Sequence, residues 1–249
     1  MIRRCSLKIF LKGYVMKKIN VLRLFLSAAI LTNRNILSLL RVNLLLLSVI
    51  FFVSYCAAVA GIKITYDRRL QELLAITISF PFISYLFAGA VYYYLSYYKG
   101  VTVRLNQIYM GFRWFANFSK LGFVLLIVYY MVIIPVFSFN EYNLEEKIRV
   151  GTGTLFFLWF LVRNFFLPIL FVDFDDSFEE LLFKSLSLSR GYVFRIIIFI
   201  AASFVVVSAG LAIAGFGVLY SISVVALAYI RFYYLVRSRE DEKIKIHSL

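Results

Sequence analysis

Histidine and cysteine are almost absent from this 249-residue sequence, which contains one histidine and two cysteines. His247 is third from the end, so a histidine general base and most transition-metal sites are excluded. Cys5 lies in a basic segment and Cys56 in a long apolar run, so they are not expected to form a disulfide with each other. We therefore expect a protein that is not an enzyme and that needs no cofactor.

Acidic residues are also scarce: 13 Asp and Glu stand against 27 Lys and Arg, which gives a net charge of +14. The chain is 63% hydrophobic with a mean hydropathy of +0.88, more apolar surface than a soluble domain of this size could bury. The basic residues flank apolar runs and no DNA-binding motif is present, so we expect no nucleic acid partner and take the lipid bilayer as the partner. No acid falls inside an apolar run, which argues against a proton relay.

Six apolar runs predict an all-α membrane protein with six transmembrane helices in three hairpins. The last two runs come from one uncharged stretch of 35 residues, which as a single helix would be about 52 Å long against a membrane core of about 30 Å. This stretch must fold back, and Gly215 and Gly217 mark the turn. We expect a transmembrane domain over residues 37–237, with helices at 37–62, 74–98, 121–139, 150–172, 196–214 and 218–236.

Positive charge is unevenly distributed between the loops. Residues 1–36 carry eight basic residues and no acid, and their apolar part is interrupted by Arg23, so we expect a cytoplasmic segment rather than a secretory signal. Met16, followed by two lysines, offers a second translation start. If both termini are cytoplasmic, including a charged tail at 238–249, then 20 of the 27 basic residues lie inside and five outside, as the positive-inside rule favours.

Segments 99–120 and 178–189 predict two cytoplasmic amphipathic helices. The second begins with a capping box, Ser177 and Glu180, and ends before Gly191, in the place of a C-cap glycine. Its expected apolar face comprises Phe178, Leu181, Leu182 and Leu186. The expected apolar face of the first comprises Leu105, Ile108, Tyr109 and Phe112, and an interfacial helix in the N-terminal segment would present Leu22, Phe25 and Ala29.

Arg163 and Asn164 lie near the middle of the predicted fourth span, where an arginine costs about 2.5 to 3.5 kcal/mol on the insertion scale. One interpretation is an anion site for a lipid phosphate or a small anion, with Arg41, at the start of the first span, as a further candidate residue. The alternative is an arginine satisfied by backbone carbonyls near Pro168, or one that reaches the headgroups along a tilted helix. The residues alone favour neither.

Three aspartates before the second amphipathic helix, Asp173, Asp175 and Asp176, could hold Mg²⁺ for phosphoryl chemistry. Acids also favour helix starts through the helix dipole alone, and no nucleophile or base accompanies them. The serines of the same helix lack a base and are expected to bond along their own helix: Ser185, Ser187 and Ser189.

Two residue types mark particular places in the spans. Pro81, Pro135 and Pro168 lie inside the second, third and fourth spans, which predicts kinked helices. Tyrosines gather at the end of the second span and predict an aromatic belt at the membrane surface: Tyr92, Tyr93, Tyr94, Tyr97 and Tyr98.

The segment YKGVTVRLNQIYMGFRWF before the third span, with DFDDSFEELLFKSLSLSRGYVFR between the fourth and fifth, resembles an uncharacterised family of six-helix bacterial integral membrane proteins. The pattern also resembles the membrane domain of some glycerophosphodiester phosphodiesterases. This chain has no soluble catalytic domain, so the resemblance implies no enzyme activity. It covers about residues 75–236 and is carried by Gly111, Phe112, Arg113, Leu182, Ser185, Leu188 and Gly191.

These patterns predict a non-enzymatic protein of the bacterial inner membrane that binds or transports an amphipathic, lipid-like anion in envelope homeostasis. The first alternative is a structural or partner-binding membrane subunit whose cytoplasmic helices dock a soluble protein. The second is a metal-dependent phosphoryl enzyme that uses the three aspartates.

Overall fold

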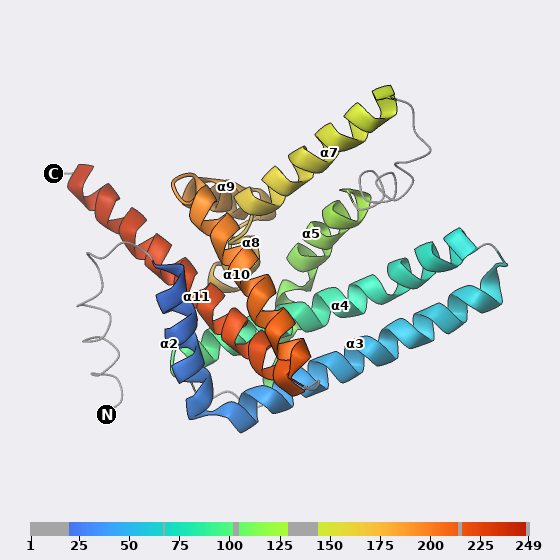
Figure 1. The fold of residues 1–249 in the computed structure, drawn as a ribbon, viewed down its shortest axis with the longest axis horizontal. Coiled ribbons are helices and arrows are strands. Elements are labelled where there is room, and N and C mark those ends of the chain that lie inside the picture. The colour runs from blue at the N-terminus through green and yellow to red at the C-terminus, as the bar shows by residue number, and fades with distance from the viewer. Residues whose placement is uncertain (1–19, 67, 102–104, 129–143, 214–215, 248–249) are drawn as a thin grey trace. The chain divides into compact units, whose positions relative to one another are not determined.

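The computed structural model describes residues 20–66, 68–101, 105–128, 144–213 and 216–247. Within these ranges all regular structure is helical, which confirms the all-α fold class. The chain divides into two compact units, Leu37–Ile196 and a second unit made of Met1–Ile36 with Ile197–Leu249 (Figure 1). Each unit is described by itself below.

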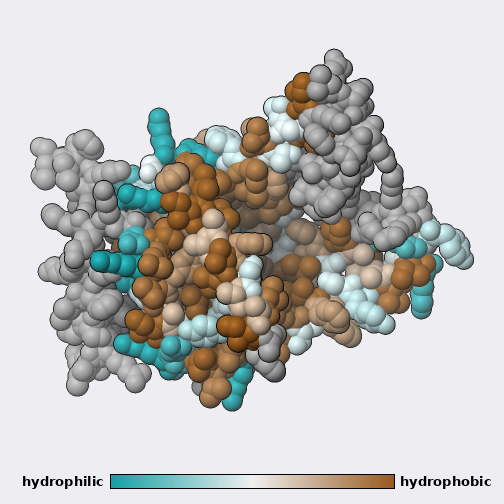
Figure 2. Space-filling model, viewed as in Figure 1, coloured by the Kyte–Doolittle hydropathy of each residue, from teal (hydrophilic) through white to brown (hydrophobic). Residues whose placement is uncertain are grey.

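Five helical stretches are long and apolar enough to cross a membrane: Ile36–Ile64, Leu74–Tyr98, Val150–Asp173, Val193–Ala212 and Gly217–Glu240. They match five of the six predicted spans. The predicted third span is described only in its first part, by α5 (Phe115–Val128), and its remainder lies outside the described residues. Large apolar side chains are widely exposed, and Figure 2 shows hydrophobic residues over much of the visible face. These are the features of a multi-pass membrane protein.

In the unit 37–196, α3 (Ile36–Ile64) and α4 (Arg68–Tyr98) lie side by side in opposite directions (Figure 1). At their turn, Gln71 Nε2 donates a hydrogen bond to the carbonyl of Thr65 at 2.8 Å. Near the other end, the Tyr94 hydroxyl donates to Asn43 Oδ1 at 2.7 Å, and this buried polar pair is satisfied. α4 continues without interruption through Pro81, while Pro135 lies outside the described residues.

The predicted amphipathic helix before the third span is a 3₁₀-helix, η1 (Leu105–Trp114), followed directly by α5. Among the η1 residues whose side chains the structure describes, those that are buried are Ile108, Gly111 and Trp114, which recur every three residues as a 3₁₀-helix requires. The other three residues of the predicted apolar face, Leu105, Tyr109 and Phe112, are 40%, 58% and 76% exposed, and their contact with a membrane stays a prediction.

Two glycines bring η1 against α4. A Cβ added to Gly89 would lie 2.0 Å from the carbonyl oxygen of Ile108, and one added to Gly111 would lie 2.5 Å from that of Tyr85. The backbones therefore approach more closely than any other residue type would allow. This contact, rather than the apolar spacing, decides which side of η1 is buried.

Two of the tyrosines at the end of α4 pack inside the protein. Tyr93 and Tyr94 are 3% and 4% exposed, and the ring of Tyr92 stacks on that of Trp114 with centroids 5.0 Å apart. The predicted aromatic belt is therefore wrong for Tyr93 and Tyr94, whereas Tyr92 is half-buried.

The second unit contains α2 (Val21–Arg34), most of α10 (Val193–Ala212) and α11 (Phe216–His247). The predicted fold-back is confirmed, although Gly217 lies in the first turn of α11 and Gly215 lies outside the described residues. α2 packs on this hairpin: the Tyr220 hydroxyl donates to Asn33 Oδ1 at 3.0 Å. Phe25, expected at a membrane interface, is instead buried and stacked on Phe199, with centroids 5.1 Å apart.

Candidate functional site

The predicted fourth span is not one helix. α7 (Leu144–Arg163) ends and α8 (Leu167–Asp173) begins after three intervening residues. Proline has no N–H, and its ring collides with the carbonyl four residues earlier, which for Pro168 is that of Asn164. That carbonyl instead accepts a hydrogen bond from the N–H of Leu167 at 3.0 Å. Pro168 thus lies in the first turn of α8, and the kink predicted there is a complete interruption.

The interruption leaves the carbonyl of Arg163 without its helical donor, because the N–H of Leu167 is bonded to Asn164. Two hydroxyls from α9 (Phe178–Ser189) replace it. Ser189 Oγ donates to this carbonyl at 2.8 Å and Ser185 Oγ donates at 3.4 Å. The end of α9 is therefore joined to the end of α7.

The prediction that the serines of α9 bond along their own helix is confirmed for Ser189, whose Oγ lies 3.1 Å from the carbonyl oxygen of Leu186. It misses their bond to Arg163. The signal was present in two parts, a proline that frees a carbonyl and a helix with two serines on one face. Nothing in the sequence spacing joins those parts.

The side chains at the interruption keep unused hydrogen-bonding atoms. Arg163 Nε is buried and has no hydrogen-bond partner, and the described residues give this arginine no carboxylate. Its Cζ lies 6.0 Å from the ring centre of Trp159, at the outer limit of a cation–π contact. Asn164 is 6% exposed; its Nδ2 donates to the carbonyl of Phe160 at 3.1 Å, which leaves Oδ1 buried and unpaired. A buried donor or acceptor without a hydrogen bond lowers the stability of the fold by about 1 to 3 kcal/mol. A ligand that forms the missing hydrogen bond would therefore bind more tightly.

Arg41, the other candidate residue for anion binding, lies exposed on α3. The hydrogen bonds that form the interruption at Arg163 do not include it. The structure therefore presents the two arginines on different helices and brings together Arg163, Asn164 and the two serines of α9.

The motif residues of the resemblance have separate structural positions. Gly111 is buried against α4, Phe112 is exposed, and Arg113 forms an ion pair with Asp175. Gly191 follows Arg190, the C-cap residue of α9; the one positive-φ glycine in the described ranges is Gly100. On α9 itself Ser185 is buried, and two leucines are half-buried: Leu182 and Leu188.

Three aspartates, Asp173 at the end of α8 and two in the loop that follows it, each form an ion pair with a different part of the chain. Lys99 follows α4, Arg113 lies in η1, and Lys184 lies on α9. The ion-paired atoms are Asp173 Oδ1 and Lys99 Nζ at 2.8 Å, Asp175 Oδ2 and Arg113 Nη2 at 2.6 Å, and Asp176 Oδ2 and Lys184 Nζ at 2.5 Å. The side chain of Asp173 is only 5% exposed, so its pair is the most protected from solvent screening.

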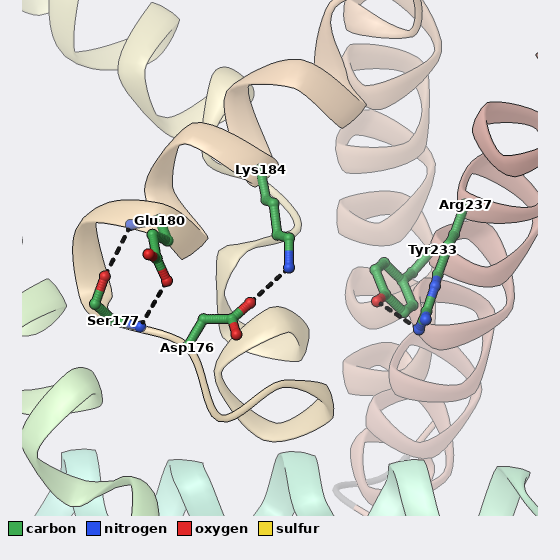
Figure 3. Close-up of polar contacts among 6 residues, drawn as sticks. All are labelled: Asp176, Ser177, Glu180, Lys184, Tyr233 and Arg237. Carbon is green, nitrogen blue, oxygen red and sulfur yellow. Dashed lines mark hydrogen bonds and ion pairs between the residues drawn. The ribbon is translucent and has the colours of Figure 1, made fainter. Parts of the chain in front are cut away.

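Figure 3 shows one of these pairs beside the predicted capping box. Glu180 N–H donates to Ser177 Oγ at 3.4 Å, and Ser177 N–H donates to Glu180 Oε2 at 3.3 Å, so α9 begins and ends at the predicted residues. No group of three His, Cys, Asp or Glu side chains within the described ranges is arranged to hold a metal ion. The aspartates position a loop, and this geometry lends no support to the phosphoryl-enzyme alternative.

Comparison with protein-family models, curated proteins and solved structures finds no match to this chain. The resemblance to the six-helix bacterial family therefore stays a prediction that rests on its motif residues.

Proposed function

We propose that this chain is a non-enzymatic multi-pass membrane protein that binds or moves an amphipathic, lipid-like anion, and that Arg163 contacts the anionic group. The observation that carries the proposal is the buried Arg163 Nε, which has no hydrogen-bond partner. A guanidinium stays charged at physiological pH, and its planar fork matches a phosphate or carboxylate through two parallel hydrogen bonds. An anion at this place would satisfy both the charge and the unused donor.

The interruption presents the arginine for binding. The backbone carbonyl that the interruption leaves without a helical donor is that of Arg163 itself, and it accepts hydrogen bonds from Ser185 and Ser189. The serines thus complete the backbone and leave the guanidinium available.

The direct test is native mass spectrometry of lipids that co-purify with the protein. We expect Arg163→Leu to lose the bound species, and Arg163→Lys to retain it weakly, because an ammonium cannot reproduce the two parallel bonds. Arg190→Leu is the matched control: it removes an exposed arginine beside α9 and should leave binding unchanged. Thermal unfolding in detergent should show that all three variants remain folded.

If Arg163→Leu keeps the same bound species as the parent, the second candidate function becomes the better one. That candidate is a structural or partner-binding subunit. It is favoured by the outer side of α9, where Phe183 is 70% exposed among charged residues that include Glu179.

We further propose six spans with both termini in the cytoplasm of a bacterium, supported by the distribution of basic residues. Five spans would carry the loop at α9 and the C-terminal end to the opposite side. In a cysteine-free background, a cysteine at Thr65 should react with an impermeant thiol reagent in intact cells, and one at Ser187 should not. Labelling of both cysteines from outside would contradict the six-span layout and fit five spans.

A further inference from the structure

The chain reverses direction where α4 ends. Gly100 has a positive φ of 76°, a conformation that favours glycine, and its N–H donates to the carbonyl of Tyr97 at 3.0 Å. The N–H of Val101 donates to the carbonyl of Ser96, also at 3.0 Å. These two bonds form a Schellman motif, which turns the chain away from the helix axis. The residues that follow are thereby directed back toward the side of α4.

η1 accordingly lies beside α4 and not beyond its end. Its two close glycine contacts involve Tyr85 and Gly89, and the Tyr85 hydroxyl donates a hydrogen bond to the carbonyl of Tyr109 at 2.7 Å. Gly89 precedes Tyr98, the last residue of α4, by nine positions, which is about 14 Å along a helix. The level of η1 can therefore be read from the level of these residues of α4.

α3 marks the two edges of the apolar layer that both helices cross. Its residues 42–62 are all uncharged, lie between an arginine and a lysine, and as a helix span about 31 Å, close to the thickness of a membrane core. α4 is joined to α3 near both edges. Tyr94 bonds to Asn43, and a Cβ added to Gly61 would lie 2.9 Å from the carbonyl oxygen of Gln71.

Both of these junctions place Tyr85 and Gly89 inside the layer. Counted from Tyr94, Gly89 is five positions inside and Tyr85 nine, or about 8 and 14 Å. Counted from Gln71, they lie about 27 and 21 Å from the opposite edge, which leaves about 3 and 9 Å of a 30 Å layer. η1 is thus embedded by roughly 3 to 14 Å, the range of helices that lie in the plane of a membrane surface.

The side of η1 turned away from α4 suits such a position. Tyr109, Met110 and Phe112 are 58%, 54% and 76% exposed, and residues 105–112 contain no charged residue. Large apolar side chains at this level require an apolar neighbour.

The basic residues that follow are directed toward the start of α9. Arg113 pairs with Asp175, and Lys120 of α5 has its Nζ 5.8 Å from the ring centre of Phe178, the first residue of α9. A long basic side chain can keep its stem in the apolar layer while its charge reaches the surface. Neither charge therefore requires η1 to lie in water.

We infer that η1 is an in-plane membrane segment whose outer side, Tyr109, Met110 and Phe112, contacts the acyl chains of the leaflet at the Arg41 end of α3. A soluble protein does not reach this level, whereas acyl chains fill it already. The contacts at Gly89 and Gly111 hold the segment in place. The level of η1 does not depend on whether Arg163 holds an anion.

Spin labelling tests the contact. The full chain with Cys5→Ala and Cys56→Ala is reconstituted in phosphatidylethanolamine–phosphatidylglycerol vesicles with one nitroxide-labelled cysteine at a time: Met110→Cys, Phe112→Cys or, at an exposed charged position, Glu179→Cys as the control. Oxygen concentrates among acyl chains, and nickel ethylenediaminediacetate stays in water. We expect the ratio of oxygen to nickel collision rates to be several-fold higher at positions 110 and 112 than at 179.

Equal ratios at the three positions would show that the outer side of η1 lies in water and would overturn the inference. Labels at 110 and 112 that collide with neither reagent would show that protein covers η1, a second copy included, and would overturn it as well. Both replaced side chains are exposed, so Tm should match that of the cysteine-free parent. Because lipid retention by the Arg163 variants is measured separately, failure here leaves the proposed function standing, and the reverse also holds.

Discussion

Replacing Gly89 with alanine should strongly destabilise the protein, because the added methyl group would lie 2.0 Å from the carbonyl oxygen of Ile108 and 2.9 Å from its carbonyl carbon. Both are backbone atoms of η1, which cannot rotate away as a side chain would. Overpacking typically costs about 1 to 3 kcal/mol, and we expect the upper end. Thermal unfolding in detergent should show a fall in Tm of about 6 to 12 °C.

The matched control is Gly151→Ala on α7, where no atom lies within 4 Å of the added Cβ. Alanine is the better helix former by about 1 kcal/mol, so Tm should stay the same or rise. Equal loss of Tm in Gly89→Ala and Gly151→Ala would mean that η1 does not pack on α4 as described.

Leu181→Asp should have the second large effect. Leu181 is 0% exposed on α9, and an aspartate there would bury a carboxylate in place of an apolar side chain. A Leu→Ala change in a core lowers stability by about 2 to 5 kcal/mol. The loss here should be larger, because desolvation of the charge is added to the lost packing. Size-exclusion chromatography and thermal unfolding should show little folded protein.

Glu179→Gln is the control for that change, because Glu179 is exposed on the same helix and is not the capping-box residue. It should leave both the yield and Tm unchanged. Similar damage from the two changes would show that the buried and exposed sides of α9 have been assigned incorrectly.

Helix α9 was predictable to the residue because its signals are local. Ser177 and Glu180 are three residues apart, and the backbone bonds that they satisfy lie within the same turn. Its buried side was predicted less well. The apolar spacing points to Leu182, which is half-buried, whereas the fully buried positions include Ser185 and Ser189. Two serines on the inner side weaken an apolar pattern.

The contacts that make the candidate site could not be predicted, because they join distant parts of the chain. Ser189 and Arg163 are 26 positions apart, and Lys99 and Asp173 are 74 apart. Arg163 itself could be singled out, since a lone arginine in an apolar run is unusual. Its place at a helix end could not, because the length and composition of residues 150–173 suit one continuous span.

The buried side of η1 could not be predicted from the apolar spacing, because its helical repeat is not that of an α-helix. Periodicity analysis assumes a turn of 3.6 residues, which groups Ile108 with Tyr109 and Phe112. A 3₁₀-helix repeats after three residues and groups Ile108 with Gly111 and Trp114. The close contact between Gly89 and Ile108 accompanies this tighter winding.

The bond between α9 and the carbonyl of Arg163 also constrains how the protein is made. Ser185 and Ser189 follow Arg163 by 22 and 26 residues, so the carbonyl is synthesised before its donors exist. At roughly 5 to 20 residues per second, the delay is about one to five seconds. The bond that joins α7 to α9 can therefore form only after α9 has been synthesised.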